Sequence, residues 1–357
     1  MSFITQNLNK FLSVVSTDIA IDLGTANTLV YVKNKGIVLN EPTIVAVNKK
    51  TGQLVAVGQE AKAMQGRTPQ HIEVVRPLVD GVISDFEVTE EMLGYLINKV
   101  QSDVRSFIAP RMLIGVPSGI TNVEMRAARD AAKNAGARDV FLIEEPMAAA
   151  IGAKLPVSKA AGNMVIDIGG GTTDIAVISL NGIVVAKNLR VAGDHLNAAI
   201  SSYIRDQFKV YVGEKTAEEA KIALASVKFD GSSNEMVIRG RDVMTGLPRE
   251  VIITAGDVKD AVASQIDTII ESTKAVLEKT PPEVMADVMQ RGIHVCGGGA
   301  LIPGLARLLE DNLQVPVIIV PDPLRSVIRG AGIVIENFEQ YEEVLIDNEG
   351  ELSPYLA

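Results

Sequence analysis

The sequence predicts an α/β protein with two similar lobes, each built on a mixed sheet that helices cover. Size is the first reason, because 357 residues exceed the roughly 250 to 300 at which one hydrophobic core stops growing. Pattern is the second, since apolar strand-like runs alternate with helical stretches. Repetition is the third, because one strand–glycine turn–strand pattern occurs twice. We therefore expect a duplicated fold with a ligand site between the lobes.

Composition excludes several functions. Hydrophobic residues make up 47% of the chain and the net charge is -10, which argues against a nucleic-acid partner, because such proteins neutralise phosphates with Lys and Arg. The single cysteine, Cys296, can form no intrachain disulfide and fits a reducing compartment. No apolar run approaches the ~18 residues of a membrane span, and the N-terminus lacks a signal-peptide pattern. A cytoplasmic location is expected.

Residues 1–17 predict a short amphipathic helix, because apolar side chains recur near the helical period and polar ones fill the other face. Its apolar residues are Phe3, Ile4, Leu8, Phe11, Leu12 and Val15. Such a helix either packs on its own domain or lies on a membrane surface. Membrane contact is the favoured interpretation, which would make the protein peripheral on the inner face of the cytoplasmic membrane.

The first hairpin is predicted from strands Ile19–Leu23 and Leu29–Tyr31, and the second from Asn163–Ile168 and the apolar run Ile175–Ile178. Between the strands lie turns of small residues: Gly24, Thr25, Ala26 and Asn27 in the first, and Gly169, Gly170, Gly171 and Thr172 in the second. A turn stripped of bulky side chains lets a ligand approach the backbone. Each half then continues with two strand–helix units.

The repeats also predict the domain organisation. We expect domain I at 18–153 and 330–357, domain II at 154–329, and two small inserted subdomains at about 34–69 and 186–252. The inserted stretches have less regular patterns than the repeats. The acidic tail after about Phe338 is expected to be mostly solvated.

The glycine turns predict a polyphosphate site, because successive backbone amides in such a turn form a concave anion cradle. Asp22 and Asp167 each end a strand beside a turn, where two carboxylates suit a hydrated Mg²⁺. A third turn would let a base or ribose pack closely, and it consists of Gly297, Gly298, Gly299 and Ala300. For hydrolysis, Glu145 before Pro146 is our first choice to orient or deprotonate the water, with Glu144 second.

Other nucleotide-binding and hydrolytic patterns do not fit the spacing. No Walker A pattern occurs, and neither Gly297–Gly304 nor Gly330–Gly332 completes a dinucleotide fingerprint. Ser118 has no nucleophile-elbow context. The histidines are scattered along the chain and predict no metal site.

These motifs resemble those of the actin, Hsp70 and sugar-kinase superfamily. Asp22–Thr25 and Asp167–Thr172 are similar to its two phosphate motifs, and Gly297–Gly299 to its adenosine motif. Within the superfamily the chain closely resembles the bacterial actin-like MreB family from about residue 18 to residue 337, above all in Ile21–Val32, Ile143–Gly152 and Thr216–Lys221. The resemblance implies an actin-like duplicated ribonuclease-H-like fold.

The resemblance also implies a function. It implies an ATPase that forms membrane-associated antiparallel double filaments, maintains cell shape and works with the cell-wall elongation proteins RodZ, MreC and MreD. By position, Asp22 and Asp167 organise the Mg²⁺, Glu145 acts on water, and Glu218 and Lys221 touch the ribose or adenine. Phe107 and Ile108 match a membrane-inserting loop. Residues 191–197 and 321–330 depart from the family pattern.

Two alternatives share the phosphate motifs, namely an Hsp70-like chaperone ATPase and a small-molecule kinase. After the Gly330–Gly332 stretch only a short acidic tail remains, which leaves no room for a peptide-binding domain. The sequence also holds no dedicated sugar-binding constellation.

Overall fold

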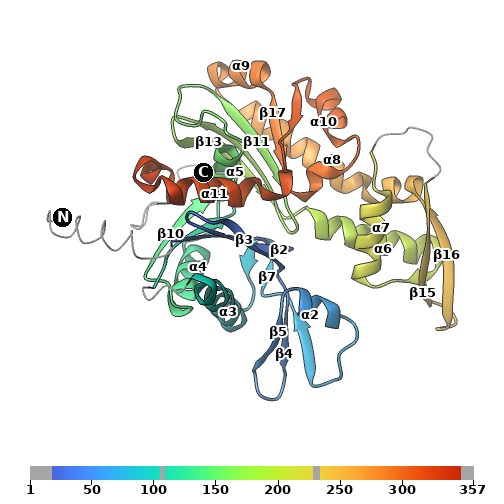
Figure 1. The fold of residues 1–357 in the computed structure, drawn as a ribbon. Coiled ribbons are helices and arrows are strands. Elements are labelled where there is room, and N and C mark those ends of the chain that lie inside the picture. The colour runs from blue at the N-terminus through green and yellow to red at the C-terminus, as the bar shows by residue number, and fades with distance from the viewer. Residues whose placement is uncertain (1–17, 105–108, 228–233, 347–357) are drawn as a thin grey trace. The chain divides into compact units, whose positions relative to one another are not determined.

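The computed structural model describes residues 18–104, 109–227 and 234–346. The predicted N-terminal helix at 1–17 and the residues Phe107 and Ile108 lie outside the described residues. The chain divides into two compact units (Figure 1). The first takes Met1–Ala160, Ile178–Ile183 and Arg325–Ala357, and the second takes Ala161–Val177 and Val184–Leu324.

The first unit contains a five-stranded sheet in the order β10-β9-β1-β2-β3. Its strands are β1 (Ile19–Leu23), β2 (Asn27–Val32), β3 (Gly36–Pro42), β9 (Arg111–Val116) and β10 (Asp139–Glu144). β1, β9 and β10 are parallel, whereas β2 runs antiparallel to both of its neighbours. Buried parallel strands read as continuous apolar runs, as β9 does. β2 begins at Asn27, so the last residue of the predicted turn already pairs with β3.

Helices of the first unit are α3 (Phe86–Val104), α4 (Asn122–Asn134), α5 (Glu145–Gly152) and α11 (Ser326–Glu336). α3 and α4 pack together beside the sheet (Figure 1), and a capping box of Thr121 and Glu124 starts α4. α5 crosses α11 with its backbone in contact, because a β-carbon at Gly330 would overlap the Ala148 carbonyl oxygen. The alanine run of α5 thus packs closely on α11.

A small antiparallel sheet in the order β5-β4-β6 completes the first unit. It consists of β4 (Val45–Asn48), β5 (Leu54–Val57) and β6 (Ile72–Val75), with helix α2 (Gln59–Met64), and the short hairpin of β7 (Leu78–Val79) and β8 (Val82–Ile83) follows it. The stretch with a less regular sequence pattern therefore forms a regular sheet, and that sheet continues to Val75.

The main sheet of the second unit has the order β13-β12-β11-β17-β18, which repeats that of the first unit strand for strand. Its strands are β11 (Asn163–Ile168), β12 (Thr173–Ser179), β13 (Gly182–Leu189), β17 (Ile293–Cys296) and β18 (Val317–Ile319). In both units a hairpin is followed by two strand–helix units. The duplication predicted from the sequence is confirmed.

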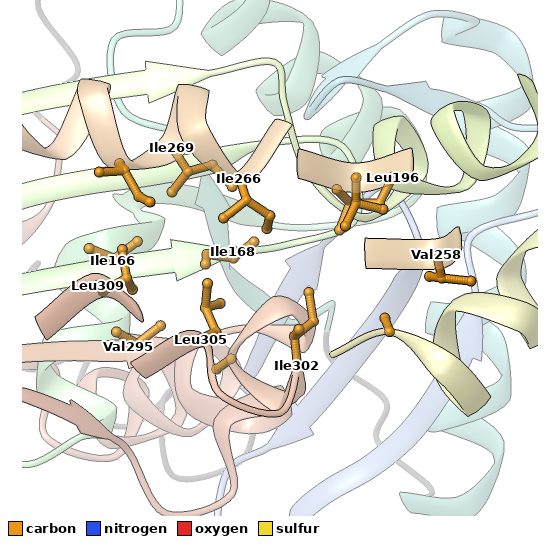
Figure 2. Packing of buried hydrophobic residues seen from close by; sticks show 14 of the residues in the cluster. Ile166, Ile168, Leu196, Val258, Ile266, Ile269, Val295, Ile302, Leu305 and Leu309 are labelled. Carbon is orange, nitrogen blue, oxygen red and sulfur yellow. The ribbon is translucent and has the colours of Figure 1, made fainter. Parts of the chain in front are cut away.

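Helices α8 (Ala255–Lys279) and α10 (Leu305–Leu313) cover one face of this sheet, and Figure 2 shows the core between them. Strand residues and helix residues meet there, namely Ile166, Ile168, Val295, Ile266, Ile269, Leu305 and Leu309. Two further short elements are α9 (Pro282–Arg291) and the 3₁₀ turn η1 (Gly298–Leu301). A capping box of Thr254 and Asp257 begins α8.

A second small sheet, β14-β15-β16, belongs to the second unit. Its elements are β14 (Val210–Tyr211), β15 (Glu235–Asp242) and β16 (Pro248–Thr254), and helices α6 (Gly193–Phe208) and α7 (Glu214–Leu224) pack beside it (Figure 1). None of the helices in the described ranges is long and apolar enough to span a membrane.

The C-terminal segment is partly exposed and partly packed on the first unit. After the 3₁₀ turn η2 (Pro323–Arg325) and helix α11, residues form η3 (Phe338–Gln340) and η4 (Glu342–Val344). The rings of Phe338 and Phe141 lie edge to face at 4.7 Å, and Leu345 forms an antiparallel bridge with Ile143. Apolar contacts thus attach residues 338–346 to the first unit, whereas Glu339, Gln340, Glu342 and Glu343 are exposed as expected.

Candidate functional site

The first predicted phosphate turn lies between β1 and β2 and is braced by side-chain hydroxyls. The Thr43 hydroxyl donates to the Gly24 carbonyl at 2.6 Å, and the Thr43 amide donates to the Ala26 carbonyl at 3.0 Å. The Thr28 and Thr43 hydroxyls are 2.9 Å apart. The Thr25 hydroxyl accepts from the Gly81 amide at 3.0 Å. Three threonines therefore fix the path of this turn.

Asp22 and Glu145 lie at the same end of the first sheet, where the parallel strands β1, β9 and β10 reach their carboxyl ends. Asp22 pairs with Gly115 of β9, and a β-carbon at Gly115 would lie 3.6 Å from Cγ of Glu145. Because Gly115 has no side chain, β9 places no side chain between the carboxylates of Asp22 and Glu145. Asp22 is partly buried, and this burial raises the pKa of its carboxyl group to about 7.

Glu145 and Glu144 occupy different positions although they are neighbours. Glu145 is the first residue of α5 and is 8% exposed, whereas Glu144 ends β10 and is the N-cap residue of the helix. Pro146 follows in the first turn of the helix, where its fixed backbone angle is tolerated. Of the two candidates, Glu145 is the one whose side chain lies beside Gly115.

The second predicted turn lies between β11 and β12 and is braced by the main chain. The Gly169 amide donates to the Thr172 carbonyl at 2.9 Å. The first amides of α6 close on the same turn, because Gly193 donates to Gly169 at 3.2 Å and Asp194 donates to Gly170 at 2.8 Å. The positive end of the α6 dipole therefore lies beside this turn, whose carbonyl groups accept from the first two amides of the helix.

Lys221 adds a positive charge at the second turn. Its ammonium group donates to the Gly193 carbonyl at 3.0 Å. Lys221 and Glu218 are three residues apart on α7 and share one helix face. Resemblance had associated both residues with the ribose or adenine, and the structure brings Lys221 to the base of the glycine turn.

Gly297 follows β17 as the N-cap residue of η1, and Gly298 and Gly299 begin η1. Gly297 has a φ of 76°, and a β-carbon there would overlap the Ile168 carbonyl and Oδ1 of Asp167. A β-carbon at Gly299 would overlap the Ile168 side chain, whereas one at Gly298 would meet only Leu324 at 3.6 Å. Two of the three glycines are therefore required by packing against β11.

Each unit brings together part of the predicted site. In the first unit Asp22, the Gly24–Asn27 turn and Glu145 lie at one sheet edge. In the second unit Asp167, the Gly169–Thr172 turn and Gly297 do so. Asp167 is buried at the end of β11 and pairs with Cys296, which is itself buried.

A magnesium ion fits the residues present. Within the described ranges no group of three or more His, Cys, Asp or Glu side chains could hold a metal ion. Mg²⁺ usually keeps several waters and takes one or two carboxylates plus phosphate oxygens, so it needs no such group. Asp22 in the first unit and Asp167 in the second each end a strand beside a glycine turn, so each unit by itself offers a carboxylate of the kind that Mg²⁺ takes.

Sequence reasoning missed Thr43, Gly115 and Gly193. Thr43 follows β3 and carries no motif, so nothing in the sequence linked it to the first turn. Gly115 appeared only as part of an apolar strand. Gly193 was noted only as part of a stretch that departs from the family pattern, although its position at the start of a helix after a strand is a usable signal for an anion site.

Comparisons with known proteins identify the relatives of this chain. The family model described as MreB/Mbl protein matches residues 16–343. The cell shape-determining protein Mbl of Bacillus cereus is 49% identical over 324 residues, which cover 90% of this chain and 97% of that protein. The cell shape-determining protein MreB of Escherichia coli (strain K12) is 46% identical over 346 residues, which cover 96% of this chain and 100% of that protein.

Solved structures agree with these relatives. MreB5 of Spiroplasma citri bound to ADP is 39% identical with a TM-score of 0.87, covering 92% of this chain and 98% of that chain. The same protein bound to AMPPNP gives a TM-score of 0.86. The chaperone and kinase alternatives are not favoured. With two equivalent glycine turns on duplicated sheets and matches along nearly its whole length, the chain belongs to the MreB/Mbl family of actin-like cell shape proteins.

Proposed function

We propose that this protein binds Mg²⁺-ATP through both glycine turns and hydrolyses it to control a filament. The observation that carries the proposal is the same aspartate and glycine turn at equivalent positions of two equivalent sheets. The relative from Spiroplasma citri was crystallised with ADP and with AMPPNP, which supports a nucleotide as the ligand. We place the phosphates at Gly24–Asn27 and Gly169–Thr172, and the nucleoside at Gly297–Ala300 with Glu218.

The residues of the site have distinct roles in this proposal. Asp22 and Asp167 hold Mg²⁺ through its water ligands, and the ion neutralises phosphate charge when bound. The α6 N-terminus and Lys221 stabilise anionic oxygen at the second turn. Glu145 orients the attacking water and accepts its proton, which is the contribution expected of a positioned general base. A buried carboxylate at a sheet edge suits that role.

Filament assembly follows if one nucleotide engages both units. A ligand shifts a conformational equilibrium only by its differential affinity for the two states, so contacts to both units favour one arrangement of the chain. That arrangement adds head to tail, and a head-to-tail contact that does not close makes an open filament. Hydrolysis weakens the filament. We further propose antiparallel pairing of filaments, as the family resemblance implies.

Membrane attachment is proposed for segments outside the described residues, namely the amphipathic helix at 1–17 and the pair Phe107 and Ile108. About six apolar side chains insert only weakly, and a chain of net charge -10 gains little from anionic lipids. A filament multiplies such contacts, so binding to the inner face of the cytoplasmic membrane depends on polymerisation. There the filament would organise cell-wall synthesis with partners such as RodZ, MreC and MreD.

Sedimentation with lipid vesicles tests the nucleotide proposal. Purified protein is spun with and without Mg²⁺-ATP, and negative-stain images of the pellets are taken. Nucleotide-dependent paired filaments on lipid are expected, and Glu145→Ala should make them more persistent by slowing phosphate release. Glu144→Ala is the matched control and should hydrolyse ATP at the normal rate. Soluble monomer under every condition would refute the filament proposal, and a Glu144→Ala defect as large as that of Glu145→Ala would refute the assignment of the base.

Deleting residues 2–16 tests the anchor. The shortened chain should still bind ATP but should no longer pellet with vesicles. If it still pellets, the helix is not the anchor, and substitution of Phe107 and Ile108 by Ser in the shortened chain then decides whether that pair suffices.

A further inference from the structure

Arg129 of α4 has a guanidinium group that the described residues leave partly unpaired. The side chain is partly buried, and its Nε and Nη2 atoms are buried without a hydrogen-bond acceptor in the described part of the chain. Burial lowers the pKa of this guanidinium, because the charged group is withdrawn from water. A buried charge without a partner is costly, which favours an anionic partner outside the described residues.

The acidic side chains of α4 and of the residue that begins β10 are engaged elsewhere. Glu124 belongs to the capping box of α4, and Asp130 lies 3.5 Å from Nε of Arg126. Asp139 accepts from Nε of Arg138 at 2.8 Å. Arg138 still has a buried Nη1 atom without an acceptor among the described residues. N–H donors without an acceptor are therefore found both on α4 and at its junction with β10.

The flank of α4 that carries Arg129 faces away from α3. Asn134 donates to Glu90 of α3 at 2.8 Å, which marks the flank next to that helix. Arg129 precedes Asn134 by five positions, so at about 100° per residue the two lie about 140° apart around the helix. α3 also packs on β5 of the small sheet, whereas α4 packs on β9 and on β10, the edge strand of the main sheet. Arg129 therefore lies on the side of α4 toward the outer edge of β10.

The C-terminal segment runs along that same edge. Leu345 forms an antiparallel bridge with Ile143, and the Ile346 amide donates to the Leu142 carbonyl at 2.9 Å. Ile346 also packs on the core cluster beneath α4. Antiparallel pairing carries the chain toward the start of β10, and α4 runs the same way because it connects the parallel strands β9 and β10. The course of the chain at Ile346 thus leads along the flank of α4 that carries Arg129.

Charge identifies the occupant of this flank. Three segments of the first unit lie outside the described residues, namely 1–17, 105–108 and 347–357. The first two contain no Asp or Glu. The third contains no Lys or Arg but has three acidic residues, Asp347, Glu349 and Glu351. When extended it spans up to about 36 Å, whereas α4 is about 20 Å long, so its carboxylates can reach Arg129.

We propose that the acidic segment 347–357 binds along this flank of α4, where one of its carboxylates pairs with Arg129. Nε and Nη2 lie on one side of the guanidinium plane, so a single carboxylate can accept from both atoms. The pairing would fasten the C-terminal segment to the first unit. It lies within that unit and needs no nucleotide, so its failure would leave the proposed ATPase function unaffected.

Hydrogen exchange of the full chain without nucleotide tests the proposal. The amides of residues 347–351 should exchange at least about threefold more slowly in the wild type than in Arg129→Met, because the pairing holds them on α4. Arg126→Met is the matched control, since Arg126 lies on the same helix with a side chain that is 83% exposed. This control should exchange as the wild type does. Salt at about 1 M should reduce the difference by screening the two charges.

A double-mutant cycle locates the partner of Arg129. The second variant combines Asp347→Asn, Glu349→Gln and Glu351→Gln, so it changes only the proposed occupant. With the acidic segment intact, Arg129→Met should lower the folding equilibrium constant by about fivefold to tenfold, and with the neutral segment by less than about twofold. Urea denaturation measures these constants.

Exchange of the two charges gives a rescue. Arg129→Glu alone should make residues 347–351 exchange rapidly. Arg129→Glu combined with Asp347→Lys, Glu349→Lys and Glu351→Lys should restore slow exchange, because the attraction then acts with the signs reversed.

The outcomes separate the possible partners of Arg129. Slow exchange that Arg129→Met removes and the charge exchange restores supports the proposal. Equal exchange in the wild type and in Arg129→Met overturns it, and so does an equal effect of Arg129→Met with the acidic and the neutral segment. Slow exchange that grows with protein concentration also overturns it, because the acidic partner would then belong to a second copy. If exchange in Asn122–Asn134 slows only when phosphatidylglycerol vesicles are added, the partner is a lipid phosphate and the proposal fails.

Discussion

The two glycine turns occupy equivalent positions but are held in different ways. Hydroxyl groups brace the first turn, since Thr43 binds Gly24 and Thr25 binds the Gly81 amide. Main-chain amides of α6 brace the second, through Gly193 and Asp194. Duplication has preserved the strand order of the two sheets but not the contacts that support their turns. The first turn should therefore be more sensitive than the second to the loss of a side-chain hydroxyl.

The largest expected effect concerns the packing beneath the second turn. Gly297→Ala should destabilise the second unit by about 2 to 4 kcal/mol, because its β-carbon overlaps the Ile168 carbonyl and its φ is 76°. Gly298→Ala is the matched control and should be close to neutral. The free energies of unfolding of both variants are measured by urea denaturation. Equal stabilities of the two variants would contradict the packing argument.

The next effect concerns the hydroxyl brace of the first turn. Thr43 is 1% exposed, so Thr43→Val leaves the Gly24 carbonyl without its donor and should cost about 1 to 3 kcal/mol of stability. Nucleotide affinity should fall with it, since the turn is no longer fixed. Thr43→Ser keeps the hydroxyl and should restore most of the stability and most of the nucleotide affinity. Calorimetry measures the ATP affinity of each variant. If Thr43→Val bound ATP as tightly as the wild type, the difference between the two turns would be contradicted.

The affinity for Mg²⁺-ATP is expected to change by about tenfold per pH unit because of Asp22. Its pKa is raised to about 7 in the metal-free protein, so the carboxyl must lose a proton before it can hold a cation. Mg²⁺-ATP affinity should therefore fall by about tenfold per unit below pH 7. Asp22→Asn should lose this dependence, whereas Asp167→Asn should keep it. A pH-independent affinity in the wild type would contradict the assignment.

The raised pKa of Asp22 also makes the stability of the folded protein depend on pH. Between the ordinary pKa of 3.8 and about 7, the folded protein holds a proton on Asp22 that the unfolded chain has lost. Stability of the metal-free protein from this group is therefore greatest below pH 3.8 and falls as pH rises to 7. Thermal unfolding of wild type and Asp22→Asn across this window should show the difference.

The smallest effect concerns the charge beside the second turn. Lys221→Met removes the donor to the Gly193 carbonyl and one positive charge, but the backbone bonds of α6 remain. ATP affinity should fall by about threefold to tenfold, corresponding to about 0.7 to 1.4 kcal/mol. Lys215→Met, on the same helix with an exposed side chain, is the control. A loss equal to that of Thr43→Val would show that the second turn also depends on a side chain.

The two hairpins and their duplication were predictable because they rest on local patterns. Apolar runs and glycine turns mark each hairpin, and their repetition marks the duplication. The reason why glycine is needed at a given position was not predictable. Gly297 and Gly299 make room for Ile168, a residue far away in sequence. Thr43 was missed for the same reason, because its partner lies across a strand pairing that no local pattern records.

The C-terminal segment shows the limit of composition. Three glutamates between Phe338 and Val344 indicate solvation, and all three are exposed. Apolar residues at the two ends of the segment, Phe338 and Ile346, nevertheless contact Phe141 and Leu142. Charge content describes the average of a segment, whereas burial is decided by a few side chains at particular positions.

The crossing of α5 and α11 has a consequence for synthesis. Apart from Ile178–Ile183, the chain leaves the first unit at Ala160 and returns to it at Arg325, so α11 reaches its place on β1, β2 and α5 only after the whole second unit has been made. The second unit, although later in sequence, can then finish folding before the first. A nascent chain stopped at Leu324 should hold a protease-resistant second unit beside a first unit that is still cleaved.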